Sequence, residues 1–335
     1  MRRYLNTACV LCASVLAITL LLMVLTPNPL ETLKNLITGP FSNTYTFGNM
    51  LSTTAILILC GAGMSISFQA GLFNLGGEGQ IYTSGLVGAL TGLVLPAGSG
   101  LFGSLGIMLA GMATGALIAG ISGVLLHRYH IHELISSFLL SGALVSLVNF
   151  LIADPLRDTE SYLQTTKEIP ASFYLTSILH PSNLTPAIFI AIIVAGILSF
   201  YLYRTPGGYE LRVTGANPSF ARFGSISHRR YTILPLLING ACYGLAGALM
   251  VLSTQHAAIV DFTAGYGWNG ITIALIAGTN PLLTIPAALL LAWLETGIRT
   301  AMAGSSISFD LSIVIRGIIL LLITLQLLPT LRKRL

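Results

Sequence analysis

Long apolar runs constrain this chain more than any other feature of its sequence. A transmembrane helix needs roughly 20 predominantly apolar residues, and ten stretches approach or reach that length. They are Ala8–Thr26, Met50–Phe68, Ile81–Leu95, Leu105–Leu126, Leu134–Ile152, Leu184–Tyr203, Tyr231–Leu252, Ile271–Thr279 with its flanks, Leu282–Ile298 and Leu311–Leu328. Only 8% of the residues are charged, against about 25% in soluble domains. The sequence therefore predicts an all-α integral membrane protein with about ten transmembrane helices.

We interpret the ten runs as one transmembrane domain over residues 1–335. The first run, residues 8–26, is expected to remain as a span, because it is long for a cleaved signal peptide and has no clear cleavage site of small residues. The third and eighth runs are short and flanked by glycine, so their boundaries are the least defined. The chain has 35 glycines, which favours closely packed helices, since small residues let backbones approach in lipid.

Basic residues set the expected orientation, because loops rich in Lys and Arg stay in the cytoplasm. With ten spans, the basic residues of both termini, of His127-Arg128 and of residues 204–230 all fall on one side. Both termini are therefore predicted to be cytoplasmic. The other side receives the long connection 154–183, which could be a cap over a pore, a docking surface for an external protein or a plain connector.

The most unusual polar stretch is residues 204–230, called here the basic segment. It holds five arginines and one acid, Glu210. Within it, Asn217 is a good N-cap, Pro218 suits the first helical position, and Gly224 suits a left-handed stop. The helix between these ends is too short to be stable alone. We therefore expect it to dock on another protein.

Two glycine-rich stretches adjoin short apolar runs. Irregular backbone at membrane depth is tolerated only where it is buried in protein or lines a wet cavity, and a carboxylate there is costly and usually functional. Gly71–Gln80 could be a broken helix that lines or braces a solute path, or an ordinary turn at the membrane surface. Its candidate path residues are Phe73, Asn74, Glu78 and Gln80.

The second stretch, Gly265–Ile271, contributes Trp268 and Asn269 as candidate path residues. Trp268 is equally well explained as an anchor at the membrane interface. One interpretation of the two stretches is that residues 50–152 and 231–328 are related halves of five helices each in opposite orientation. In such inverted repeats the solute site commonly lies where the halves meet.

Other kinds of chemistry find little support in the sequence. The net charge of +5 does not indicate nucleic-acid binding, because the basic residues lie in loops between apolar runs. His127, His130 and His132 lie close together, but a polar cytoplasmic turn explains them without a metal. No nucleophile–base pair is evident, so the chain is predicted not to be an enzyme. No lysine follows a glycine, as a phosphate-binding loop requires, so ATP would have to bind another subunit.

Gly71–Gln80 closely resembles a signature of bacterial ABC importer permeases for nucleosides, simple sugars and riboflavin, within the branched-chain-permease-like superfamily. That signature reads Gly-Leu-Phe-Asn-Ile-Gly-Ala-Glu-Gly-Gln, so Gly77 stands here in place of alanine. Residues 133–137 with Asn149, and residues 205–224, are similar to further segments of the family, and Asn149 is a further candidate path residue. The likeness runs from about residue 50 to the C-terminus. Arg316 departs from it, at a position that more often holds glutamine.

The resemblance implies a permease in the bacterial inner membrane that pairs with a second permease subunit, identical or different. It also implies two ATP-binding subunits and an external solute-binding lipoprotein. This chain would bind no cofactor, and ATP would be held by its partners. A coupling helix in the basic segment would seat on the ATPase. The implied coupling residues are Gly215, Asn217, Pro218, Ala221, Arg222, Phe223 and Gly224.

The expected function is therefore that of the permease subunit of an ATP-driven importer. Nucleosides are the first expected solute, and riboflavin or a simple sugar are the alternatives. The rival class is an ion- or proton-coupled carrier that acts alone, with Glu78, Glu295 and Asp310 as its relay. A neighbouring reading frame with a phosphate-binding loop would distinguish the two classes.

Overall fold

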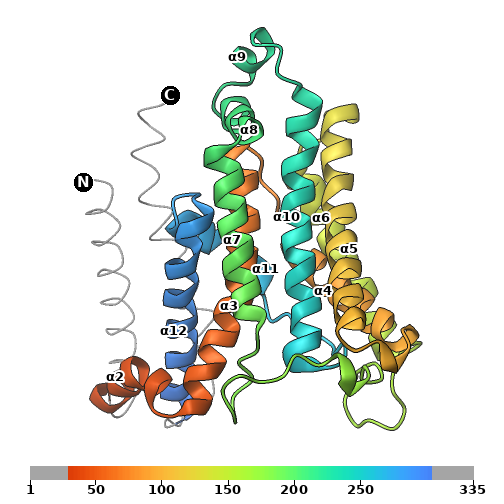
Figure 1. Cartoon of the computed structure of the whole chain (residues 1–335), viewed down its shortest axis with the longest axis vertical. Coiled ribbons are helices and arrows are strands. Elements are labelled where there is room, and N and C mark those ends of the chain that lie inside the picture. Colours follow the sequence, from red (N-terminus) through yellow and green to blue (C-terminus); the bar gives the residue numbers. More distant parts are fainter. Residues whose placement is uncertain (1–28, 304–335) are drawn as a thin grey trace. The chain divides into compact units, whose positions relative to one another are not determined.

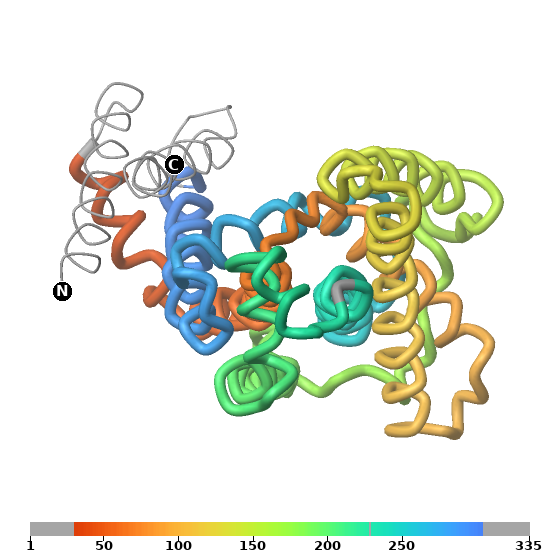
Figure 2. The backbone as a smooth tube through the Cα atoms, turned by 90° about the horizontal axis from the view of Figure 1, so that it is seen from above, coloured from red at the N-terminus to blue at the C-terminus, as the bar shows by residue number. Residues whose placement is uncertain are grey.

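The structure is a computed structural model that describes residues 29–303 (Figures 1 and 2). The predicted first and tenth spans, together with Asp310 and Arg316, lie outside these residues. The α-helices of the described part are α2 (Pro29–Thr38), α3 (Thr44–Gln69), α4 (Gly77–Val94), α5 (Gly100–Tyr129), α6 (Glu133–Ala153), α7 (Ala187–Arg204), α8 (Pro206–Ala216), α9 (Pro218–Phe223), α10 (His228–Met250), α11 (Tyr266–Ile276) and α12 (Thr284–Ala303).

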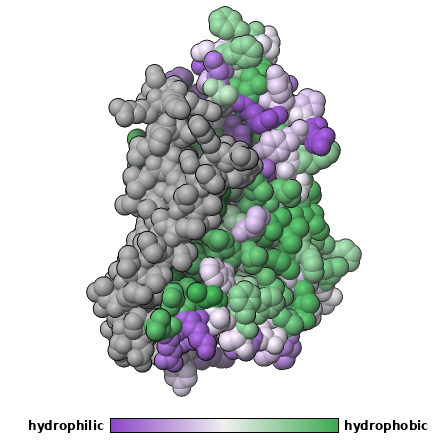
Figure 3. Space-filling view, turned by 90° about the vertical axis from the view of Figure 1, so that its left-hand side faces the viewer, coloured by the Kyte–Doolittle hydropathy of each residue, from purple (hydrophilic) through white to green (hydrophobic). Residues whose placement is uncertain are grey.

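Among the described residues, six helices are long and apolar enough to cross a membrane. They contain α3, α5, α6, α7, α10 and α12, and each coincides with a predicted run, so these six predictions are confirmed. Figure 3 shows one face of the molecule, where hydrophobic side chains form a band with hydrophilic ones gathered above and below it. The chain is thus an all-helical, multi-pass membrane protein over the residues that the structure describes.

The two short predicted runs correspond to α4 and α11, and neither has the length and apolarity of those six. α4 begins with the polar residues of the sequence Gly-Glu-Gly-Gln. α11 has 11 residues and is about 16 Å long at 1.5 Å per residue, roughly half the hydrocarbon thickness. It is preceded by irregular backbone at 256–265 that is partly buried. The eighth run is therefore not a full helical span, but a short helix with an irregular lead-in.

Glycines bring α5 and α10 into direct backbone contact, and the two helices lie side by side in both views (Figures 1 and 2). A Cβ built on Gly240 would lie 2.1 Å from the carbonyl oxygen of Gly115, and one on Gly244 would lie 2.1 Å from that of Gly111. No side chain larger than hydrogen fits at such a crossing. This glycine seam is the close packing expected from the composition, since small residues let helices approach in membranes.

The long connection between α6 and α7 is docked on the chain that follows α10. The Thr166 N–H donates to the Ala258 carbonyl at 2.9 Å, and the Ile169 N–H donates to the His256 carbonyl at 2.9 Å. The His256 ring stacks on Tyr174 with centroids 3.6 Å apart. Burial lowers the pKa of His256 below its ordinary value. The connection is thus held by backbone pairing at one end of the bundle.

By the density of its contacts the chain divides into two units, residues 52–288 and the residues on either side. In the described part of the second unit, residues 29–51 contact the end of α12. The Thr300 hydroxyl donates to the Asn35 carbonyl at 3.0 Å, and the Trp293 indole N–H donates to the Ile37 carbonyl at 3.2 Å. The candidate site lies entirely in the unit 52–288.

Candidate functional site

The chain between α3 and α4 leaves the helix at residue 70 and resumes it at Gly77. Side chains on one face of α6 accept hydrogen bonds from three backbone N–H groups of this break and of the start of α4. Glu133, Ser137 and Ser141 follow each other at intervals of four, so they lie on that face; we call them the α6 row. They accept from the N–H groups of Phe73, Leu75 and Gly79 at 3.0, 3.0 and 2.8 Å.

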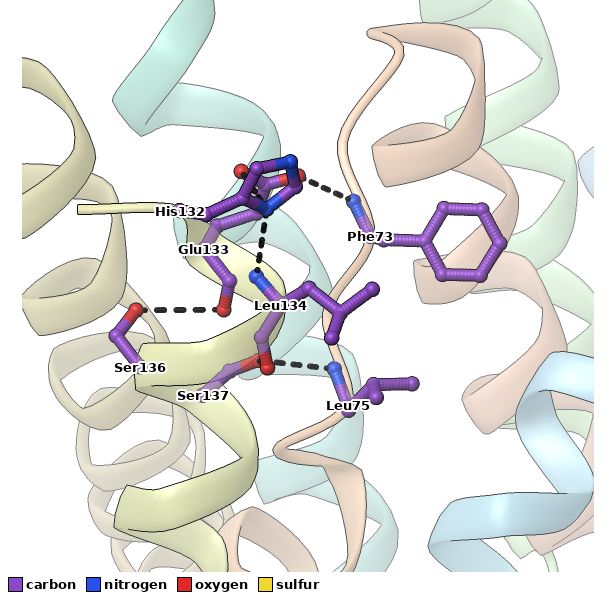
Figure 4. A network of polar contacts seen from close by, with 7 residues as sticks. All are labelled: Phe73, Leu75, His132, Glu133, Leu134, Ser136 and Ser137. Carbon is purple, nitrogen blue, oxygen red and sulfur yellow. Dashed lines mark hydrogen bonds and ion pairs between the residues drawn. The ribbon is translucent and has the colours of Figure 1, made fainter. Parts of the chain in front are cut away.

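Figure 4 shows the upper part of this arrangement, with the Glu133 and Ser137 side chains reaching across to the irregular chain. Glu133 is 4% exposed, and its second oxygen lies 3.2 Å from Nδ1 of His132. A buried carboxylate is costly unless it is hydrogen-bonded or paired; Glu133 accepts the Phe73 N–H, and its contact with His132 is an ion pair when the imidazole is protonated. The α6 row thus satisfies a stretch of backbone that would otherwise be unsatisfied at membrane depth.

Asn74 and Gln80 form a buried polar network with α10. The Asn74 amide donates to Gln80 Oε1 at 3.1 Å and to Asn239 Oδ1 at 3.0 Å, and Asn239 donates to the Ser67 hydroxyl at 2.9 Å. All four side chains are at most 1% exposed. This geometry braces the α3–α4 break, and a solute contact by Asn74 and Gln80 stays a prediction.

Glu78, at the start of α4, holds the lead-in to α11. Its carboxylate accepts from the Thr263 hydroxyl, from the Gly265 N–H at 3.0 Å and from the Gly267 N–H at 2.8 Å. A Cβ on Gly267 would lie 2.2 Å from the Glu78 nitrogen, so the two glycine-rich stretches predicted from the sequence touch each other. Glu78 is half-buried, and this bracing is the role that its geometry supports.

The predicted path residues on the other helices lie in two further places. Asn149, on α6, accepts from the Tyr82 hydroxyl and donates to Asp261 at 3.2 Å. Asn269 is fully buried, whereas Trp268 is 39% exposed. The structure therefore brings Asn74, Gln80 and Glu78 into the bracing of the two breaks and leaves Trp268 on the surface.

Aromatic rings are the exposed members of the candidate set. Trp268 meets Phe138 of α6 edge to face, with centroids 6.2 Å apart, and half of the Phe138 side chain is exposed. Phe73 is 41% exposed and lies against Phe68 with centroids 4.6 Å apart. Phe138 was not a predicted site residue, because an aromatic residue in an apolar run gives no local signal that distinguishes it from a lipid-facing one.

The basic segment forms two helices, α8 and α9, and α8 was not predicted. Thr205 caps α8 by accepting from the Gly208 N–H at 3.1 Å. In α9, Asn217 accepts from the Phe220 N–H at 3.0 Å and Pro218 opens the helix, so both predicted positions are confirmed. The predicted left-handed stop at Gly224 is wrong: its φ is −78°, and Ser225, with φ of 57°, takes the left-handed position.

Of the predicted coupling residues, Ala221 is buried, and Phe223 is 91% exposed. Pro218, Arg222 and Gly224 are exposed, and Asn217 holds the N-terminus of the helix. Gly215 instead lies in backbone contact with the end of α3. A Cβ built on Gly215 would lie 2.2 Å from the Gln69 carbonyl oxygen and 2.6 Å from the carbonyl carbon of Ala70. The basic segment thus touches the α3–α4 break directly.

Comparison with known proteins assigns the chain to a family. Residues 46–324 match the family described as "Branched-chain amino acid transport system / permease component". The protein named "Probable riboflavin import permease protein" of Treponema pallidum is 29% identical over 97% of this chain and 86% of its own length. A guanosine ABC transporter permease protein of Bacillus subtilis is 28% identical, covering 85% and 82%. A glucose ABC transporter permease protein of Haloferax volcanii is 27% identical, covering 82% and 75%.

The family match covers most of the chain, and the structure places the signature stretch at the break between α3 and α4. The relatives that carry these names are permeases rather than nucleotide-binding subunits. The chain therefore belongs to the branched-chain amino acid transport system permease family, and it is the permease component of an ABC importer and not its ATPase.

Proposed function

We propose that the solute of this permease is a nucleoside. The observation that carries the proposal is the exposed aromatic pair of Trp268 and Phe138. Aromatic side chains stack on flat heteroaromatic rings, and each stacked base contributes about 1–3 kcal/mol to binding. The relatives include permeases named for guanosine and for nucleosides. Riboflavin, whose ring is also flat, is the second candidate, favoured by the Treponema relative; a simple sugar is the third.

Uptake by cells that express the complete transporter tests the solute. Wild-type cells should accumulate labelled guanosine or adenosine, and Trp268→Leu and Phe138→Leu should each lower uptake about tenfold at limiting solute, because the stacking surface is lost. Phe189→Leu on α7 is the matched control, since Phe189 is also exposed, at 58%, but is not part of the pair. Preference for riboflavin or glucose over nucleosides in the wild type would replace the proposed solute.

The second part of the proposal concerns energy coupling. α9 and its flank, from Gly215 to Gly224, seat in an ATP-binding subunit, which binds the nucleotide. The exposure of Phe223 at 91% and of Phe220 at 62% supports this, because such side chains at the tip of a loop need a partner surface. ATP binding moves the basic segment and switches the path from outward to inward access.

Co-purification of the ATP-binding subunit tests the coupling role. Asn217→Pro, which removes the cap, and Arg222→Glu, which reverses a charge, should each lower the amount of ATPase that is retained. Arg229→Glu serves as the control for charge alone, because Arg229 is exposed but lies outside α9. Undiminished assembly in Asn217→Pro and Arg222→Glu would remove α9 from the interface.

The remaining assembly is proposed on the same basis. A second permease subunit and an external solute-binding lipoprotein complete the transporter in the bacterial inner membrane, with both termini of this chain in the cytoplasm. A reporter fused after Ile226 should therefore be active only as a cytoplasmic fusion. An ion-coupled carrier is disfavoured, because Glu78, the first member of its relay, accepts hydrogen bonds from two backbone N–H groups and a hydroxyl.

A further inference from the structure

A cavity of about 300 Å³ lies where the basic segment meets the helix bundle. Its walls come from the start of the α3–α4 break, the end of α5, the end of α8, α9 and the start of α10. Residues that represent these elements are Leu72, His127, His130, Thr214, Arg222 and Thr232. None of these six is among the candidate path residues, although Leu72 is next to Phe73 in the α3–α4 break.

The ionisable groups that line the cavity are basic or phenolic. His127 and His130 come from the end of α5, and Arg222 comes from α9. None of these three side chains forms an ion pair within the described residues. The contact there between a basic and an acidic side chain joins His132 and Glu133 instead. Tyr231, which also lines the cavity, donates its hydroxyl to Glu210 at 2.7 Å, and Glu210 is not itself part of the lining. The cavity therefore offers unpaired cationic and imidazole donors without a competing carboxylate.

The position of the cavity matters as much as its charge. Its floor includes Ala70, Gly71 and Gly215, where the end of α8 lies directly on the chain that leaves α3. Arg222 and Pro218 belong to α9, whereas His127 and His130 belong to the main bundle. A ligand that bridges Arg222 to the two histidines would therefore tie α9 to α5.

We propose that this cavity binds a phosphate-bearing anion that restrains the basic segment. Arginine recognises phosphate through paired N–H donors, and imidazole N–H groups add further donors. The volume is at the lower end of the range for small-molecule sites, about 300–1,000 Å³, so it suits a phosphate monoester or a phospholipid head group rather than a whole dinucleotide. The inference rests on the proposed function in one respect, namely that α9 is the part that moves with the ATPase.

Hydrogen–deuterium exchange on the assembled transporter tests the site with glycerol 3-phosphate as the probe. In phosphatidylcholine nanodiscs, the probe should slow exchange in residues 126–132 and 214–224 in a saturable manner. The double variant His127→Ala/His130→Ala should weaken the apparent Kd at least tenfold, since the hydrogen bonds that the imidazole N–H groups donate to a charged group are lost. Arg229→Gln, an exposed cation outside the cavity lining, should leave the Kd unchanged.

The source of the phosphate is distinguished by the lipid. If glycerol 3-phosphate has no effect in phosphatidylcholine, but nanodiscs that contain phosphatidylglycerol slow exchange in the same two segments, and the double variant removes that effect, the ligand is a lipid head group. Protection by neither source, protection that survives in the double variant, or equal weakening by Arg229→Gln would each overturn the proposal. Nucleoside uptake by the wild type is measured separately, so a transporter that imports its solute but binds no phosphate refutes this inference alone.

Discussion

The glycine seam between α5 and α10 gives the sharpest prediction, because two similar substitutions should have opposite signs. Gly240→Ala would place a Cβ 2.1 Å from the Gly115 carbonyl oxygen and 2.6 Å from the Ala119 Cβ. Ordinary van der Waals contact begins at 3.4 Å, and the nearest obstacle is backbone, which has no alternative rotamer. The helices must move apart, so packing is lost on both sides of the new methyl group.

The magnitude follows from general costs. Overpacking of a well-packed interior destabilises by about 1–3 kcal/mol, and the better helix propensity of alanine offsets up to about 1 kcal/mol of this. At Gly196 of α7 a Cβ would meet nothing within 4 Å, so Gly196→Ala should gain the propensity term without the clash. We therefore expect Gly240→Ala to lower the thermal midpoint, and Gly196→Ala to leave it unchanged or raise it.

Thiol reactivity provides the assay. Cys60 and Cys242 are free and buried, so a thiol-reactive dye reports their exposure on heating. Cys9 and Cys12, outside the described residues, are first replaced by serine in all variants. Equal midpoints for Gly240→Ala and Gly196→Ala would show that the backbones of α5 and α10 do not touch as described.

Three further predictions concern the breaks and the outer connection. Ser141→Ala should destabilise the protein by about 1–3 kcal/mol, because the Gly79 N–H loses its acceptor in a buried place. Ser146→Ala, at an exposed site on the same helix, should change the melting temperature little. Similar losses of stability in both variants would contradict the role of the α6 row. Glu78→Gln should lower both stability and uptake, because an amide nitrogen would face a backbone donor; normal uptake and melting would show that the carboxylate does not hold the lead-in to α11. The pKa of His256 is lowered by burial, so the stability that its neutral form contributes is present above the ordinary histidine pKa of about 6.5 and is lost as the pH falls below it. The protection factors for amide exchange in residues 165–175, which correct for the intrinsic pH dependence of exchange, should fall between about pH 7 and pH 5 in the wild type and much less in His256→Gln, and identical pH profiles would refute this link.

The sequence predicted the features that depend on local composition. Six long apolar runs became helices, because a run of about 20 apolar residues can satisfy its backbone in lipid only as a helix. The cap at Asn217 was also predictable, since the donor that it accepts lies three residues away. The stop of α9 was not, because the left-handed residue proved to be Ser225 rather than the neighbouring glycine.

Contacts between distant segments were beyond the sequence. Nothing local shows that Ser137 and Ser141 accept from a stretch about 60 residues earlier, although the spacing of four from Glu133 onward is a signal that places all three on one face. The partner of Asn74 on α10 is 165 positions away. Glu78 was singled out for its cost in the membrane, and its three donors come from a segment that only the folded chain brings near it.

The contact of Gly215 with the end of α3 has a mechanical consequence. Main chain rests on main chain there, with no side chain between them whose rotamers could absorb a shift. A displacement of α8 by a fraction of an ångström must therefore be matched by the opposing backbone at Gln69 and Ala70, or the surfaces separate. The linkage between the loop and the interrupted helix therefore resists compression, so a displacement of α8 toward the end of α3 is passed on to that backbone.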